Sequence, residues 1–361
     1  MKLRKPRNRI VSWLLIKNYM TKILLIYTGG TIGMMQNAKT GSLRPFNFKH
    51  LTKQVPELSR FNLDLHSVSF KKPIDSSDMH PRVWIELAEI IEKNYSKYDG
   101  FVVLHGSDTM AYTASALSFM LENLSKPVIL TGSQLPIGII RTDGKENLIT
   151  AIEIAAAKNK QGKALVPEVA IYFEYELYRG NRTLKYNSEH FDAFQSPNYP
   201  VLAEAGVSIT YNSNYIEKHS QKKFTIHKNL DNDIVVLNLF PGISKKITEA
   251  ILNTKGIKAV ILHTFGAGNA PTESWFISQL EQAIKRGIII LNVTQCLEGR
   301  VIQGKYETSS LLQKIGVISG EDITLEAAVT KLMFLLGKKL PLGQTKKLLT
   351  QNLRGEISIS N

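Results

Sequence analysis

Short runs of apolar, β-branched residues alternate with helix-like segments along most of the chain. Glycine, proline or polar residues bound each run, as expected of strands that are buried on both faces. The segments between them repeat their apolar positions with the period of a helix. This alternation is typical of a parallel sheet covered by helices. In the first half, the predicted strands are Lys22–Tyr27, Gly100–His105, Pro127–Thr131 and Glu168–Phe173.

The segment Thr109–Leu124 predicts the helix that connects two of these strands. Its apolar positions recur with helical period, and Asp108 directly before it is suited to be its N-cap. We therefore expect a strand–turn–helix–strand unit, whose crossover should be right-handed.

From Tyr211 to Asn232 the chain becomes polar, and a second α/β alternation follows. A length of 361 residues also favours two domains. We expect an α/β protein with a larger N-terminal domain (residues 20–211), whose mostly parallel sheet is flanked by helices. A linker (212–232) then leads to a smaller, doubly wound C-terminal α/β domain (233–361). Its predicted strands are Ile234–Leu239, Lys258–His263 and Gly287–Val293, and its predicted helices lie near 244–253, 272–286, 325–336 and 342–351.

The net charge of +14 is concentrated in part at the start of the chain, where residues 1–19 contain six basic residues and no acidic one. The remainder therefore carries +8 without long basic runs, which favours solubility over nucleic-acid binding. Residues 1–19 have a short apolar centre and lack a small-residue cleavage site. We interpret them as a disordered basic leader or a mis-assigned start before Met20. One cysteine, Cys296, cannot form an internal disulfide, which favours a reducing, cytoplasmic compartment.

Three strands of the first domain end in turns rich in hydroxyl groups. These turns read TGGTIG (28–33), HGSDTM (105–110) and TGSQLP (131–136). The carboxyl ends of parallel strands meet at one edge of a sheet, which is where open α/β sheets bind ligands. The sequence therefore predicts a site at this edge.

The residue types in these turns favour nucleophilic catalysis by a hydroxyl. TGGTIG lacks the lysine of a phosphate-binding P-loop, and the eight histidines are too scattered to predict a metal site. The glycines before Thr31 would let its side chain approach a substrate closely. Ser107 and Asp108 supply a hydroxyl and a carboxylate nearby, and a lysine acting as base would need a lowered pKa. Each residue alone could equally cap a turn.

TGGTIG and HGSDTM together resemble the two signature turns of bacterial-type L-asparaginases, the asparaginase/glutaminase family. The likeness extends from about Met20 to the C-terminus and is closest to the cytoplasmic type I branch. Further matching segments are DSSDM (75–79), TGSQLP, LYRGNRTLK (177–185), FDAFQSPN (191–198), GAGNAP (266–271) and NLRGE (352–356).

The resemblance implies a role for each catalytic position. Thr31 matches the threonine that attacks the side-chain amide and becomes acylated. Ser107, Asp108 and Lys185 match a group that transfers protons and activates water. The implied reaction is hydrolysis of L-asparagine to L-aspartate and ammonia through a threonine ester, without a cofactor or a metal.

The resemblance also implies a set of substrate contacts. Ser76 and Asp108 match residues that hold the α-carboxylate and α-ammonium groups, and Ser77 matches a further contact. The backbone of Ser133 would face the amide. Asn269 matches a residue that reaches a neighbouring subunit's site, which implies a homodimer or homotetramer.

Two positions depart from the family pattern. Ser107 replaces the usual threonine, which keeps the hydroxyl group and removes a methyl group. The segment MMQNAKTGSLRPFNF (34–48) has no tyrosine where family members carry one, so neither Ser42 nor Leu43 is assigned a role. Two alternatives to an asparaginase remain: the amidase-like subunit of a tRNA-dependent amidotransferase, and a non-catalytic amino-acid sensor on the same scaffold.

Overall fold

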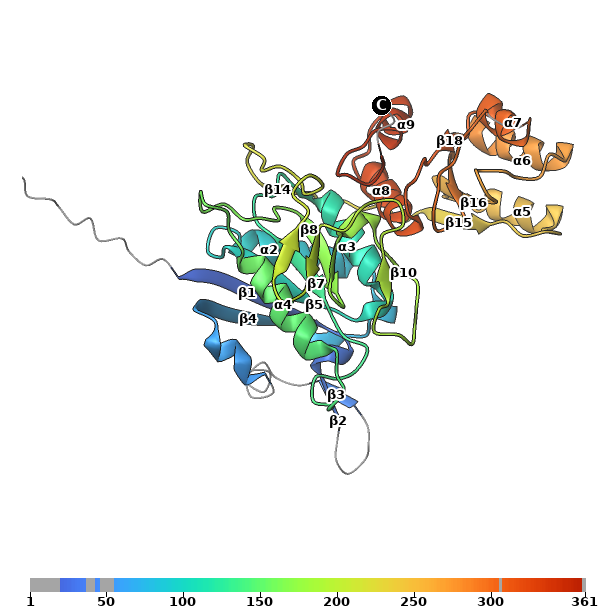
Figure 1. The fold of residues 1–361 in the computed structure, drawn as a ribbon. Helices are drawn as coiled ribbons and strands as arrows, with labels where there is room; N and C mark the ends of the chain where they lie inside the picture. Colours follow the sequence, from blue (N-terminus) through green and yellow to red (C-terminus); the bar gives the residue numbers. More distant parts are fainter. Residues whose placement is uncertain (1–19, 37–42, 46–54, 305–306, 359–361) are drawn as a thin grey trace, which may run out of the picture.

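A computed structural model describes residues 20–36, 43–45, 55–304 and 307–358 and has an α/β fold with two domains (Figure 1). The leader expected at residues 1–19 lies outside these ranges. The N-terminal domain contains an eight-stranded sheet, in which five neighbouring strands are parallel and the other three join through antiparallel pairs. In spatial order the strands are β13 (Ile209–Tyr211), β12 (Ala203–Ala205), β9 (Glu176–Arg179), β8 (Val169–Phe173), β7 (Val128–Thr131), β5 (Gly100–Leu104), β1 (Thr21–Gly29) and β4 (Leu63–Ile74).

Helices cover both faces of this sheet because successive strand residues point to opposite sides. In β1, Leu24 and Ile26 face α2 (Pro81–Asn94) and α3 (Met110–Met120). Ile23 and Leu25 face α4 (Gly144–Ala156) on the other side. The result is a three-layer domain with two apolar cores, and the strands predicted from apolar runs are confirmed.

The predicted helix over 109–124 is wrong at both ends. It ends at Met120 because Leu121–Glu122 forms a short strand, β6, that pairs with β14 (Thr225–Ile226). It begins at Met110, and its N-cap is Thr109, which makes no side-chain capping bond. Asp108 is therefore not the N-cap. It lies in a 3₁₀ turn, Ser107–Thr109, and its carboxylate bonds instead to a distant lysine, Lys185.

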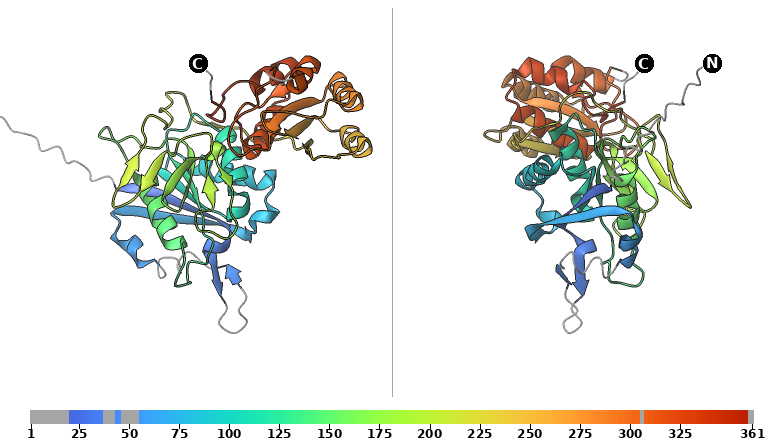
Figure 2. Two further views of the ribbon diagram at one scale, coloured as in Figure 1. Left: turned by 45° about the vertical axis from the view of Figure 1, so that its right-hand side comes forward. Right: turned by 90° about the vertical axis from the view of Figure 1, so that its left-hand side faces the viewer.

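The C-terminal domain is built on a four-stranded, all-parallel sheet. Its strands are β15 (Ile234–Asn238), β16 (Ala259–Thr264), β17 (Ile289–Thr294) and β18 (Ile318–Ser319). One face packs against α5 (Lys245–Leu252), α6 (Ser274–Lys285) and α7 (Glu307–Ile315), and the other against α8 (Leu325–Gly337) and α9 (Leu342–Leu349). All views place this domain on one side of the larger one (Figure 2).

Apolar and charged contacts join the two domains. Phe119 of α3 stacks on Phe334 of α8, with ring centroids 5.8 Å apart. Arg182, which is 1% exposed, bonds the carboxylate of Asp322 at 2.9 Å and the carbonyl of Glu356 at 2.8 Å. The segment after α9 thus returns to the N-terminal domain and lies in the junction.

Candidate active site

Four turns gather at the carboxyl edge of the parallel strands. The turn Thr31–Gly33 follows β1, Ser76–Asp78 follows β4, and Ser107–Thr109 follows β5. The residues after β7 form the fourth turn, which contains Ser133. The edge predicted from the sequence therefore carries the predicted hydroxyl-rich turns.

Glycines allow three of these turns to approach one another closely. Gly30 has φ +88°, and a Cβ added there would lie 2.4 Å from the amide nitrogen of Gly106. A Cβ on Gly106 would in turn lie 2.6 Å from Oγ of Ser76. Side chains at either position would force the turns apart. The glycine before Thr31 thus brings that residue's turn against the turn that contains Ser107 and Asp108.

Lys185 meets Ser107 and Asp108 in a hydrogen-bonded group. It lies on β10 (Leu184–Lys185), which pairs with β11 (Phe194–Gln195). Its ammonium donates to Oγ of Ser107 at 2.9 Å and to Oδ1 of Asp108 at 2.7 Å. The Ser107 hydroxyl donates in turn to Oε1 of Gln134 at 3.3 Å. Lys185 is nearly buried, whereas Asp108 is 66% exposed and therefore open to a ligand.

The turn that contains Ser76 and Ser77 is fixed against this group. The Thr109 hydroxyl donates to the Ser76 carbonyl at 2.7 Å. Oδ1 of Asp75 accepts from both the amide and the hydroxyl of Ser77, and these bonds hold the pKa of the Asp75 carboxyl below its usual value. Ser76 is 4% exposed and Ser77 is exposed, so the turn presents one hydroxyl inward and one at the surface.

The turn after β7 is held by Asp143, which the sequence did not single out. Its carboxylate accepts the amides of Gln134 at 2.9 Å and of Leu135 at 3.1 Å. Burial raises the pKa of Asp143, and these two bonds oppose that shift. The Ser133 hydroxyl donates to the Leu135 carbonyl at 2.6 Å. The Ser133 hydroxyl proton is therefore engaged within the turn.

A buried histidine, His105, is hydrogen-bonded to the residue directly before the Ser107 turn. Nδ1 of His105 donates to the Gly106 carbonyl at 2.7 Å, and its Nε2 accepts from the Thr113 hydroxyl at 2.9 Å. Trp84 donates to the same hydroxyl at 3.0 Å, which fixes the direction of the chain of bonds. Burial lowers the pKa of His105 to about 4, so the ring is neutral at neutral pH. His105 stands within HGSDTM, and that position was the only signal for it in the sequence.

Other residues named from the sequence, whether or not they were assigned a role, lie outside the bonded group of Lys185, Ser107 and Asp108. Asn269 lies in the C-terminal domain, where its amide donates to the Phe265 carbonyl at 2.8 Å in the turn after β16. Ser42 lies outside the described residues, and Leu43 is described only as part of the short strand β3 (Leu43–Pro45). Thr31 is half-buried, and its side chain makes no hydrogen bond to another residue of the described ranges.

The site offers hydroxyls, a carboxylate and an ammonium group. Across residues 20–36, 43–45, 55–304 and 307–358, no group of three histidine, cysteine or acidic side chains is arranged to hold a metal ion. In the same ranges, no helix has the length and apolar character that crossing a bilayer requires. The arrangement suits acyl transfer, in which one hydroxyl attacks and a second group moves protons.

Comparisons with known proteins agree with this geometry. The family models "Asparaginase, N-terminal" and "Glutaminase/Asparaginase C-terminal domain" match residues 22–217 and 233–349. L-asparaginase 1 of Escherichia coli K12 is 44% identical over 340 residues, which cover 93% of this chain and 98% of that protein. One component of the glutamyl-tRNA(Gln) amidotransferase of Pyrococcus abyssi is 32% identical, over 98% of this chain and 81% of that component.

A solved structure shows the same likeness in three dimensions. The crystal structure of L-asparaginase I from Vibrio cholerae has a TM-score of 0.86 to this structure and is 41% identical, and the match covers 94% of this chain and all of that one. Both domains, in their order, are thus accounted for by one family. The chain belongs to the asparaginase family.

Proposed function

We propose that the protein is an L-asparagine amidohydrolase, which converts L-asparagine and water into L-aspartate and ammonia. The observation that carries the proposal is the bonded group of Lys185, Ser107 and Asp108 beside the turn of Thr31. The whole-length similarity to L-asparaginases supports the choice of reaction. Release of ammonia from L-asparagine, D-asparagine, L-glutamine and asparaginyl peptides tests it, and no release from L-asparagine would refute it.

In the first step, Oγ1 of Thr31 attacks the carbon of the side-chain amide. The C–N bond breaks, ammonia leaves with the proton taken from the threonine, and a β-aspartyl ester of Thr31 remains. Backbone N–H groups of the turns would stabilise the charge on the carbonyl oxygen. The lack of a hydrogen bond from Thr31 to another described side chain supports this role, because its hydroxyl is free to turn towards the substrate.

In the second step, water attacks the ester carbon and releases L-aspartate. Ser107 is suited to relay the proton of this water towards the Thr31 oxygen that leaves, taking one proton as it gives up its own, because the bond from Lys185 holds its Oγ in place. Asp108 holds Lys185 in place through the bond at 2.7 Å. The neutral state of His105 keeps a second positive charge away from Lys185.

The substrate is held through both of its α groups. We assign the α-carboxylate to the turn of Ser76 and Ser77 and the α-ammonium to the exposed carboxylate of Asp108. The bond from Thr109 to the Ser76 carbonyl fixes the spacing between these two anchors. The backbone of Ser133 would face the amide. Anchors that are fixed relative to Thr31 favour one side-chain length over another.

Asparagine is expected to exceed glutamine in kcat/KM. The extra methylene of glutamine moves the amide carbon away from Thr31, and one methylene changes discrimination by about 10- to 200-fold. Steady-state ammonia release with each amino acid at several concentrations measures the ratio. Equal kcat/KM values for the two substrates would contradict the assigned anchors.

We further propose that the protein works as a homodimer or homotetramer in the cytoplasm. Phe240, Leu297 and Ile302 are exposed beyond the carboxyl ends of the strands in the C-terminal domain, at the same edge as the turn of Asn269. A second copy would cover these apolar side chains and would receive Asn269 in its site. The free, exposed Cys296 supports a reducing compartment.

Mixing two inactive variants tests this sharing of the site. Thr31→Ala and Asn269→Ala should each be strongly impaired alone. When their subunits are exchanged, one site in each mixed pair regains both native residues, so activity should rise above the mean of the separate proteins. Activity that stays at that mean after exchange, with mixed pairs verified by mass spectrometry, would show that Asn269 does not serve a neighbouring site.

A further inference from the structure

Two lysine-rich loops that are far apart in the sequence lie together in the fold. The first covers residues 158–163 (KNKQGK), and the second covers residues 217–223 (EKHSQKK). Nε2 of His219 in the second loop donates to the carbonyl of Ala164, beside the first loop, at 2.8 Å. Both loops lie near the amino ends of the parallel strands, opposite the edge that carries the candidate active site.

A cavity of about 230 Å³ lies between these loops. Its walls include three lysines, Lys126, Lys158 and Lys163, together with His219 and one carboxylate, Asp99. That carboxylate is already engaged, because it accepts the amide of Lys22 at 2.8 Å and pairs with Lys158 at 3.2 Å. Positive charge in the cavity therefore exceeds negative charge.

Lys126 is half-buried in the wall of this cavity. Its ammonium donates to the carbonyls of Tyr95 and Tyr98, which leaves one N–H of the three for a further partner. It forms no ion pair with any carboxylate of the described ranges. Burial and the nearby Lys158 lower the pKa of Lys126, and the nearby Asp99 offsets these two effects only in part. An anion in the cavity would compensate both effects.

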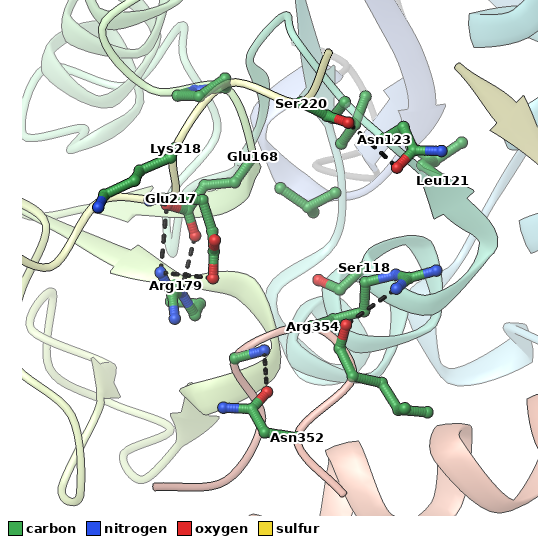
Figure 3. A pocket seen from close by; sticks show the side chains of 15 residues that line it. Ser118, Leu121, Asn123, Glu168, Arg179, Glu217, Lys218, Ser220, Asn352 and Arg354 are labelled. Carbon is green, nitrogen blue, oxygen red and sulfur yellow. Dashed lines mark hydrogen bonds and ion pairs between the residues drawn. The ribbon is translucent and has the colours of Figure 1, made fainter. Parts of the chain in front are cut away.

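A second cavity, of about 350 Å³, adjoins the first at Ser220, which lines both. Figure 3 shows its polar walls, in which Ser220 donates to Asn123 at 3.1 Å. Lys218 at its rim is exposed and has no ion pair in the described part of the chain. Nε of Arg354 on the opposite wall is buried without a hydrogen-bond partner. Lys218 and Arg354 thus continue the basic lining into the second cavity, whose two carboxylates, Glu168 and Glu217, are already paired with Arg179.

We propose that the smaller cavity binds the phosphate group of a small phosphorylated molecule, whose remainder extends past Ser220 into the larger cavity. A phosphate offers three acceptor oxygens and up to two negative charges, which suits several cations that approach from different directions. The cations surround a compact hollow, whereas an extended nucleic acid would need a longer basic track. This site lies outside the active site and does not depend on the proposed function.

Calorimetric titration with inorganic pyrophosphate and with adenosine 5′-monophosphate tests the proposal. Both probes should bind the native protein. Adenosine 5′-monophosphate should bind more tightly than pyrophosphate, because its nucleoside part also fills the larger cavity. The double variant Lys163→Glu/Lys218→Glu should weaken binding by on the order of tenfold or more. Asparagine turnover should be retained in this variant, because the changes lie at the opposite edge of the sheet.

The double variant Lys314→Glu/Lys347→Glu is the matched control. Both lysines are exposed on helices of the C-terminal domain, and the change in net charge is the same. Equal weakening in both double variants would show a diffuse effect of net charge and would overturn the proposal. The proposal would also be overturned if neither probe bound. Binding of oligoribonucleotides that is tighter than that of the probes, and that increases with their length, would overturn it too, because it would indicate an extended surface that binds polyanions.

Discussion

Thr31→Ala is expected to abolish formation of the covalent ester. Thr31 stands where glycines bring its turn against the Ser107 turn, and no other described side chain engages its hydroxyl. Without that hydroxyl the amide carbon has no nucleophile at the required place, so the acid-quenched protein should carry no added mass in the presence of L-asparagine. Thr28→Ser is the control. Its hydroxyl can keep the bond to the Leu104 carbonyl, and the ester should still form.

Ser107→Ala should give a different defect. Loss of a proton-transferring group costs roughly 10²-fold or more in turnover. Because this hydroxyl serves mainly the water-dependent step, the ester should accumulate and be found on the peptide that contains Thr31. Substrate affinity should persist in both variants, since neither hydroxyl is the main anchor of the α groups. An adduct mapped to Ser107 in the Thr31→Ala protein would reverse the two roles.

Lys331→Met should lower the free energy of unfolding by about 3–5 kcal/mol, the cost of leaving a buried charge without its partner. Lys331 Nζ lies 2.6 Å from Oε1 of Glu356, and both side chains are 0% exposed. The remaining carboxylate would still accept the amides of Leu353 and Arg354, but its charge would be uncompensated. Denaturant unfolding, followed by fluorescence, measures the change.

Two further variants separate burial of charge from loss of packing. Lys331→Met/Glu356→Gln removes both charges and keeps an acceptor for the amides, so it should recover most of the lost stability. Lys285→Met breaks an exposed pair with Glu281 one helical turn away and should change stability by less than about 0.5 kcal/mol. A double variant as unstable as Lys331→Met alone would show that charge is not the main term, and that packing and the lost bonds from Lys331 to the carbonyls of Leu349 and Gln351 outweigh it.

The sequence predicted the elements whose signal is local. Strands such as β5 and β8 are apolar throughout because both faces are buried, and the structure confirms them. The strand β4 was not predicted. Most of its residues are partly buried or exposed, so charged and apolar types are mixed along it and it has no continuous apolar run. The end of α3 could not be foreseen either, because it depends on β14, about a hundred residues further along the chain.

The same distinction applies to the site. The hydroxyl-rich turns could be found because each is a short contiguous motif, and the sheet topology then placed them together. Asp108 was expected to cap a helix because it directly precedes the predicted helix in the sequence. Its carboxylate instead bonds to Lys185, which is far away in the sequence. Asp143 and the chain of bonds from Trp84 to His105 join residues that are separate in the sequence, so no local pattern indicates them.

The segment that returns from α9 to the domain junction makes the two cores mutually dependent. Arg182, at 1% exposure, takes Asp322 and the carbonyl of Glu356 as partners, and Asn181 bonds the carbonyl of Arg354. If either domain unfolded, these polar groups would lose their hydrogen-bond partners in the other domain, which would lower the stability of the domain that remains folded. We therefore expect the two domains to unfold as one cooperative unit, with the turn of Asn269 held in one orientation relative to the catalytic edge of its own chain.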